Sequence, residues 1–105
     1  GATRFEVRVP GADSNPYLVL ATIISLGLRG IERKLEISHP PLAKGNKAHV
    51  DSYKSVRLAR NLMEANERFM RQGSVAREVF GDEFVQHFGG TREHEIRLWE
   101  QTVTD

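Results

Sequence analysis

Three charged residues at two-residue spacing, Arg4, Glu6 and Arg8, are the part of the sequence best suited to chemistry. In a strand, side chains two positions apart project from the same face, about 6.5–7 Å from one another. One carboxylate between two guanidiniums can then ligate a hard divalent cation while the guanidiniums bind phosphate or carboxylate. The alternative is a solvated strand face with a weak charge ladder, a common arrangement because exposed charges are cheap to keep. From the residues alone, this alternative is favoured.

The histidines give weaker evidence for a functional site than the charged triplet does. His39 and His49 lie in a stretch rich in turn formers, and His87 and His94 are seven positions apart on an expected helix. That spacing is not the i,i+4 pattern that chelates zinc. The sequence also has no Ser-His-Asp order, no glycine-rich phosphate loop and no carboxylate pair typical of glycoside hydrolysis. The charged triplet is therefore the candidate site.

Length and composition bound the classes of protein that remain. The 105 residues, 39% hydrophobic and 28% charged, predict one soluble globular unit. The net charge of +1, with acids and bases interspersed, gives no basic stripe, so we expect no nucleic-acid partner. The absence of cysteine excludes disulfides and is compatible with a reducing compartment, so cytoplasm is the expected location. The start shows no leader and the run from Tyr17 to Leu28 is too short to span a bilayer, so no membrane attachment is expected.

The elements that would position the triplet follow from local patterns. Residues 4–9 alternate polar and apolar with period two, which predicts a strand with Phe5, Val7 and Val9 on its second face. Pro10 and Gly11 end this strand, because proline cannot donate to a ladder and glycine frees the backbone to turn.

Start and stop signals divide the rest of the chain into helices. Asn15 followed by Pro16 is a strong start, since asparagine can cap orphan backbone amides and proline at the first helical position loses only an unused donor. Gly73 is a stop, and Gly89 with Gly90 inside the last helix predicts a kink or a close helix contact. The expected helices cover residues 16–35, 52–72, 74–80 and 82–103.

Three motifs carry a resemblance to a known family. The segment from Arg4 to Leu18 is similar to the R-x-E-x-R-x-P-G-A-D-A-N-P-Y-L signature near the end of the catalytic domain of glutamine synthetases. The G-I-E-x-K-L run at 30–35 and the segment 74–85 continue the match, as does the ending with its V-T-D at 103–105. Only the loop at 38–54 is idiosyncratic. The ending resembles the γ-glutamylpolyamine synthetase-like branch better than the housekeeping ammonia-using enzymes.

The resemblance implies an α+β fold in a larger parent enzyme, in which an antiparallel active-site sheet is covered by outer helices. Residues 1–105 would then be the C-terminal fragment of the catalytic domain, with residues 3–9 as one N-terminal active-site strand followed by mostly α-helices. The family's glutamate loop, its other metal carboxylates and its N-terminal domain would lie upstream. This fragment would therefore be inactive by itself.

The resemblance also assigns roles to the triplet. Glu6 matches the family carboxylate that binds the catalytic Mg²⁺ or Mn²⁺. Arg4 matches the arginine that steadies the phosphoryl group transferred from ATP, and Arg8 matches the one that contacts glutamate or the acyl phosphate. The implied reaction is phosphorylation of the γ-carboxylate of glutamate by ATP, then attack on γ-glutamyl phosphate by ammonia or an amine.

The implied partners are the remainder of the parent chain, further copies in a ring-shaped homo-oligomer, glutamate, and ammonia or an amine. Two other hypotheses remain open. One is a non-catalytic structural or signalling paralogue, against which the retention of Arg4, Glu6 and Arg8 argues mildly. The other is a helical interaction module used without its barrel.

Overall fold

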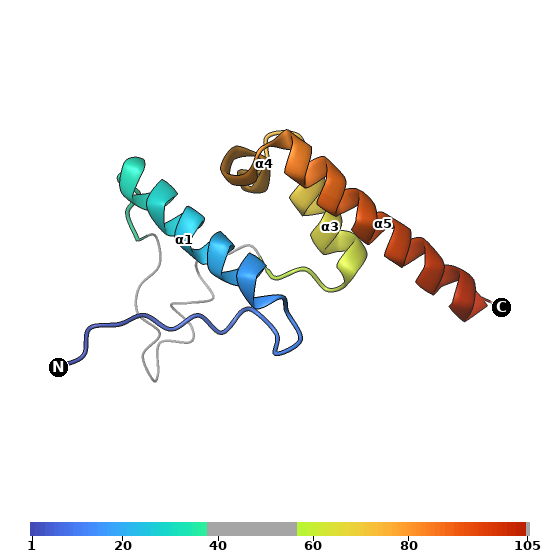
Figure 1. Ribbon diagram of the computed structural model, residues 1–105, viewed down its shortest axis with the longest axis horizontal. Coiled ribbons are helices and arrows are strands. Elements are labelled where there is room, and N and C mark those ends of the chain that lie inside the picture. The colour runs from blue at the N-terminus through green and yellow to red at the C-terminus, as the bar shows by residue number, and fades with distance from the viewer. Residues whose placement is uncertain (38–56, 105) are drawn as a thin grey trace. The chain divides into compact units, whose positions relative to one another are not determined.

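The computed structural model describes residues 1–37 and 57–104 of the chain (Figure 1). The chain divides into two compact units, Gly1–Glu36 and Ile37–Asp105. The described helices are α1 (Pro16–Glu32) in the first unit, and α3 (Leu62–Met70), α4 (Val75–Phe80) and α5 (Asp82–Thr104) in the second. The expectation of a mostly helical chain is therefore confirmed.

The expected strand over residues 3–9 is not formed. These residues run as a trace without regular secondary structure (Figure 1). A strand exists through hydrogen bonds to a neighbouring strand, and no part of the chain that the structure describes supplies one. The apolar side chains of this segment are accordingly exposed, Phe5 by 78% and Val9 by 69%. The prediction of one N-terminal strand is wrong for this structure.

The end of α1 is set by its own backbone. The helix ends at Glu32, short of the expected Leu35, because Lys34 adopts a left-handed conformation with φ of 51°. The N–H groups of Leu35 and Lys34 then donate back to the carbonyls of Gly30 and Ile31, at 3.0 and 3.2 Å. This pair of bonds is the Schellman arrangement, which satisfies the last orphan carbonyls of a helix.

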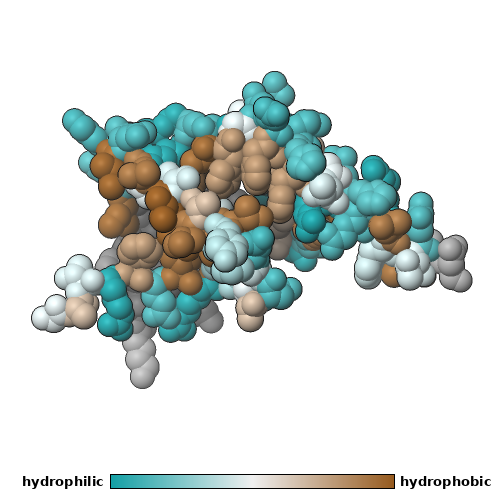
Figure 2. Space-filling view, in the orientation of Figure 1, coloured by the Kyte–Doolittle hydropathy of each residue, from teal (hydrophilic) through white to brown (hydrophobic). Residues whose placement is uncertain are grey.

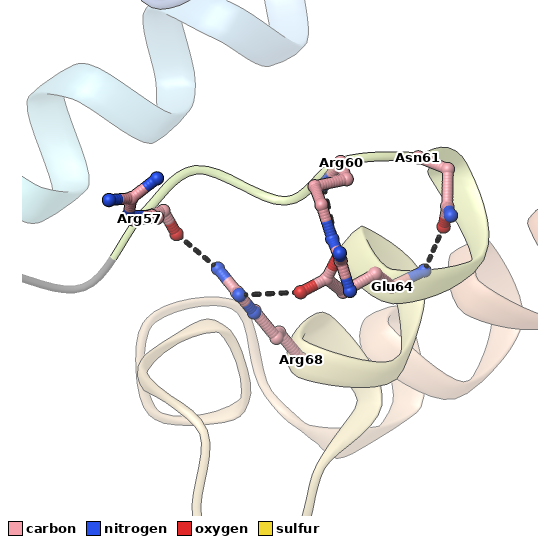
Figure 3. Close-up of polar contacts among 5 residues, drawn as sticks. All are labelled: Arg57, Arg60, Asn61, Glu64 and Arg68. Carbon is pink, nitrogen blue, oxygen red and sulfur yellow. Dashed lines mark hydrogen bonds and ion pairs between the residues drawn. The ribbon is translucent and has the colours of Figure 1, made fainter.

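The beginning of α3 lies ten residues later than the expected helix start at 52. Residues 52–56 of that expected helix lie outside the described residues, and 57–61 precede the helix without joining it. Asn61 caps α3, since its Oδ1 accepts from the N–H of Glu64 at 2.8 Å, while Oε2 of Glu64 accepts from the N–H of Arg60 at 2.9 Å (Figure 3). In this variant of the capping box, the return bond comes from Arg60, the residue before the cap, and the pair of bonds fixes where the helix begins.

Arg68 ties the preceding segment to the same helix end. Its guanidinium donates to Oε1 of Glu64 at 2.8 Å and to the carbonyl of Arg57 at 2.7 Å (Figure 3). The backbone hydrogen bond from Arg60 lowers the pKa of Glu64 most, partial desolvation opposes this, and the charge of Arg68 lowers the pKa further. Glu64 is thus a structural carboxylate of α3.

The second unit packs α3 and α4 against α5. Val85 is completely buried at its centre. Phenylalanine rings of the same unit pack against one another: Phe69 and Phe88 meet edge to face at 5.7 Å between centroids, and Phe84 lies 5.4 Å from Phe80 and 5.6 Å from Phe88. Aromatic pairs at such separations add stabilisation beyond their buried area.

Arg77 connects the ends of all three helices. Its Nε donates to the carbonyl of Met70 at 2.9 Å, and its terminal nitrogens donate to Asp82 at 3.0 Å and Gln86 at 3.3 Å. The hydroxyl of Ser74 accepts from the backbone N–H of Arg77 at 3.2 Å and so caps α4. The guanidinium of Arg77 therefore links the last turn of α3 to the beginning of α5 by hydrogen bonds.

The glycine pair inside α5 makes a close helix contact, one of the two outcomes its sequence indicated. α5 continues through Gly89 and Gly90 as one helix. A Cβ at Gly89 would collide with Cγ and Sδ of Met70 on α3. Asn66, only 6% exposed, donates from Nδ2 to the carbonyl of Gly89 at 3.0 Å. Gly89 is thus required for α3 to approach α5.

Apolar side chains are widely exposed on the surface (brown in Figure 2). α1 has no buried residue, and Tyr17 and Ile31 are 83% and 74% exposed. Even so, none of the helices in the described ranges combines the length and the apolar character needed to cross a bilayer.

We expect the isolated chain to self-associate, because exposed apolar surface of this kind is stabilised by contact with another protein surface. Sedimentation velocity should show species heavier than the 11.9 kDa monomer. The double variant Leu20→Glu with Ile24→Glu, at exposed positions four apart on α1, should shift the distribution towards monomer. A wild-type chain that sediments as a monomer and melts cooperatively would contradict this expectation.

Candidate functional site

The charged triplet lies on the irregular segment that precedes α1. Nε of Arg8 donates to Oε1 of Glu6 at 2.6 Å, and the two side chains are 85% and 60% exposed. Arg4 is exposed on the same segment. The structure therefore brings Glu6 and Arg8 into contact, whereas it describes no contact that draws Arg4 to them.

The contact between Glu6 and Arg8 does little for stability, because an ion pair this exposed contributes at most a small free energy. For chemistry, the lone pairs of Glu6 and the donors of Arg8 that this contact leaves unused matter more. An ionised carboxylate has about four lone-pair positions, so accepting one N–H leaves room for a cation or a second donor. The remaining guanidinium donors of Arg8 can likewise bind a carboxylate or a phosphate.

Glu6 fits a divalent cation as one ligand, since it offers an accessible carboxylate oxygen. The described residues supply no further set of ligands: among residues 1–37 and 57–104, no three His, Asp or Glu side chains gather. His87 and His94 are exposed on α5, and His39 and His49 lie outside the described residues. Mg²⁺ requires near-octahedral oxygen coordination, so Glu6 would provide one ligand among several.

A capped turn connects the charged segment to α1. The N–H of Ser14 donates to the carbonyl of Gly11 at 3.2 Å and closes the turn. Asn15 then caps the helix, its Oδ1 accepting from the N–H groups of Tyr17 at 2.9 Å and Leu18 at 3.4 Å. The local sequence thus determines where the helix begins relative to the charged residues.

Open grooves on the second unit were missed by the sequence analysis. They run along α3 and the C-terminal half of α5, with volumes of about 440 Å³ and 380 Å³. The lining combines apolar side chains (methionine, isoleucine, leucine and tryptophan) with a larger number of glutamates and arginines. The spacing of Ile96, Trp99 and Val103 on one helix face is the sequence signal that could have indicated this surface. The lining residues are Asn61, Leu62, Met63, Asn66, Glu67, Met70, Arg71, Glu93, Glu95, Ile96, Arg97, Trp99 and Glu100.

The amino-acid sequence of the chain matches a known protein family. Residues 1–105 match the family described as "Glutamine synthetase, catalytic domain". The chain is 41% identical over 105 residues to Type-1 glutamine synthetase 2 of Dictyostelium discoideum, covering 97% of the chain and 19% of that protein. It is 42% identical over 99 residues to glutamate–isopropylamine ligase of a Pseudomonas species, covering 94% of the chain and 20% of that protein.

A third relative has a similar extent of match. The chain is 37% identical over 102 residues to gamma-glutamylethanolamide synthetase of Streptomyces coelicolor, covering 97% of the chain and 21% of that protein. No solved structure matches significantly. The chain thus spans about a fifth of the length of these curated relatives, and by its full-length match it belongs to the glutamine synthetase family, within the catalytic domain.

Proposed function

We propose that this chain is part of an ATP-dependent ligase that joins ammonia or an amine to the γ-carboxylate of glutamate. The observation that carries the proposal is the Glu6–Arg8 contact at 2.6 Å on an accessible segment, in a chain whose relatives are named for glutamine synthesis or for joining glutamate to amines. A carboxylate and a guanidinium side by side suit a reaction that handles a phosphoryl group and an amino acid together.

The proposed chemistry proceeds through γ-glutamyl phosphate. A γ-carboxylate oxygen of glutamate attacks the terminal phosphorus of ATP and ADP leaves. The amine nitrogen then attacks the acyl carbon and loses one proton, the carbon–oxygen bond to phosphate breaks, and inorganic phosphate leaves. A bound Mg²⁺ or Mn²⁺ would supply charge neutralisation for the phosphates, with Glu6 as one of its ligands. Arg4 stabilises the transferred phosphoryl group, and Arg8 holds the carboxylate of glutamate or the acyl phosphate through its planar fork.

The acceptor is the open part of this proposal. Two of the three relatives described above carry names of amide-forming ligases for isopropylamine or ethanolamine, and one carries the name of a glutamine synthetase. These names include both kinds of acceptor. The resemblance of the chain ending to the γ-glutamylpolyamine synthetase-like branch points to an amine, and the proposal keeps ammonia and an amine as its two acceptors. A cytoplasmic location and a ring-shaped homo-oligomer complete the proposal, on the general behaviour of the family.

A non-catalytic paralogue is the second candidate function. The observation that favours it is the exposure of the charged pair: Arg8 and Glu6 are 85% and 60% exposed and bond to each other, as in a solvated charge ladder. A scaffold would bind neither ATP nor glutamate in the full-length protein, so the two functions differ in a direct measurement.

The test compares the isolated chain with the full-length protein that contains it. Each is incubated with ATP, Mg²⁺, glutamate and a panel of ammonia, isopropylamine, ethanolamine and putrescine, and products are identified by mass spectrometry. We expect a γ-glutamyl amide from the full-length protein and none from the 105-residue chain, because most phosphate, metal and glutamate contacts lie outside it. Amide formation by the isolated chain would contradict the fragment interpretation, and none from the full-length protein would favour the scaffold.

A further inference from the structure

We propose that Met70 is an oxidation site, at which a peroxide converts the thioether to a sulfoxide and so loosens the contact between α3 and α5. Met70 is the last residue of α3, and its side chain contacts α5 at Gly89. The inference goes beyond the proposed ligase chemistry, because it involves neither the charged triplet nor a bound nucleotide, and it concerns the second unit alone.

The first step is the place of the sulfur between the two helices. A Cβ at Gly89 would collide with Cγ and Sδ of Met70, so the thioether fills the space that the glycine leaves open on α5. Asn66, four residues before Met70 on α3, donates from Nδ2 to the carbonyl of Gly89 at 3.0 Å and to Sδ of Met70 at 3.5 Å. An amide nitrogen carries two hydrogens, so both of its donors are used. The Asn66 side chain thus joins the sulfur to the backbone of α5.

The second step is access for an oxidant. Met70 is half-buried and lines the open groove of about 440 Å³. A water molecule takes about 30 Å³ of liquid volume, so the groove admits hydrogen peroxide, which is only slightly larger. Met63 lines the same groove seven positions earlier on α3 and is 48% exposed. These two are the methionines of the chain, so an exposed one stands beside the half-buried one for comparison.

The third step is the reaction. A lone pair of the Met70 sulfur attacks one oxygen of hydrogen peroxide and the O–O bond breaks. The hydroxide that leaves takes the proton of the transferred hydroxyl and becomes water. The sulfur loses two electrons, the peroxide gains them, and the flexible apolar side chain becomes a polar, chiral sulfoxide.

The fourth step is the effect of the sulfoxide on the helix contact. On the side of Asn66, the new oxygen would stand in the space between Sδ and Nδ2, so the amide must move and the carbonyl of Gly89 loses its donor. On the groove side, it makes the group that packs on Gly89 polar, and hydration draws the side chain away from α5. The three atoms nearest to a Cβ at Gly89 all belong to Met70. Oxidation of Met63 therefore leaves this contact in place.

The experiment treats the full-length protein with hydrogen peroxide and reads the result by peptide-level mass spectrometry. Sulfoxide at Met70 and Met63 is quantified over time, and hydrogen–deuterium exchange is measured on the peptides of α3 and α5 in each sample. We expect Met63 to oxidise first and Met70 to follow. Exchange of the α3 and α5 amides should become about tenfold faster in step with Met70 sulfoxide alone. Methionine sulfoxide reductases should restore slow exchange, because this oxidation is reversible.

Three variants make the test specific. Met70→Leu keeps much of the side-chain volume without the sulfur, so exchange should stay slow after peroxide treatment. Met70→Gln places a polar group at the same contact and should accelerate exchange without any peroxide. Met63→Leu is the matched control and should respond to peroxide as the wild type does.

Each part of the inference has a result that would overturn it. If Met70 stayed reduced while free methionine in the same solution became fully oxidised, the sulfur would not be accessible to the oxidant. If exchange were unchanged at full oxidation of Met70, or as slow in Met70→Gln as in Met70→Leu, the contact would tolerate a polar group. An acceleration by peroxide that persisted in Met70→Leu would belong to another residue.

Discussion

If the full-length protein is the proposed ligase, its turnover should fall by roughly 10²–10³-fold when Glu6 is replaced by Gln. The amide keeps the shape of the side chain but removes the negative charge that a hard divalent cation requires. Metal binding and metal–ATP binding should therefore weaken together, and the metal concentration for half-maximal activity should rise. Steady-state kinetics over a range of Mg²⁺ concentrations, with direct Mn²⁺ titration beside them, measure this.

Two variants make the result specific. Arg8→Lys keeps a positive charge but loses the planar fork, so the loss should appear in glutamate affinity or phosphoryl transfer while metal binding survives. Glu64→Gln is the matched control, because Glu64 also accepts from an arginine, Arg68 at 2.8 Å, but in the capping box of α3. It should cost stability without changing the metal dependence. If Glu6→Gln left metal dependence unchanged, the triplet would be the solvated charge ladder that the residues alone favour.

The helix starts could be read from the sequence where a local signal determines them. α1 begins at Pro16, as the Asn15–Pro16 pair indicates, because a cap and a fixed φ act within one turn. The start of α3 was misplaced although Asn61 and Glu64, three residues apart, were there to indicate it. The apolar residues before Asn61 continue the helical spacing of the sequence, and periodicity alone does not show at which residue the helix begins.

The strand could not be established from residues 3–9, because pairing is a property of two segments and only one is present among the described residues. The site shows the same division. Residue types and the family resemblance singled out Arg4, Glu6 and Arg8. They did not predict that Arg8 would contact Glu6 at 2.6 Å and that no described contact would join Arg4 to this pair. The rotamers of long side chains depend on the groups around them. Most of the groups expected around this triplet belong to the remainder of the parent protein that the resemblance implies.

A second large effect is expected on stability, from the glycine pair in α5. Gly89→Ala should lower the free energy of unfolding of the full chain by about 1–3 kcal/mol. The new Cβ would collide with Cγ and Sδ of Met70, and Cγ lies near the backbone, where the side chain has little freedom to move away. Such a loss is severe because this unit has a small apolar core: among its described residues, Val85 is the hydrophobic side chain that is buried.

Gly90→Ala is the matched control one position along the same helix. A Cβ at Gly90 would meet nothing within 4 Å, so alanine there should raise the free energy of unfolding by about 0.5–1 kcal/mol through helix propensity. Urea denaturation followed by circular dichroism at constant chain concentration measures both changes. Met70→Ala removes the colliding atoms, so adding Gly89→Ala to that background should cost much less than in wild type, a coupling that a double-mutant cycle isolates. If Gly89→Ala and Gly90→Ala were equally stabilising, α3 would not approach α5 as closely as the contact between Met70 and Gly89 requires.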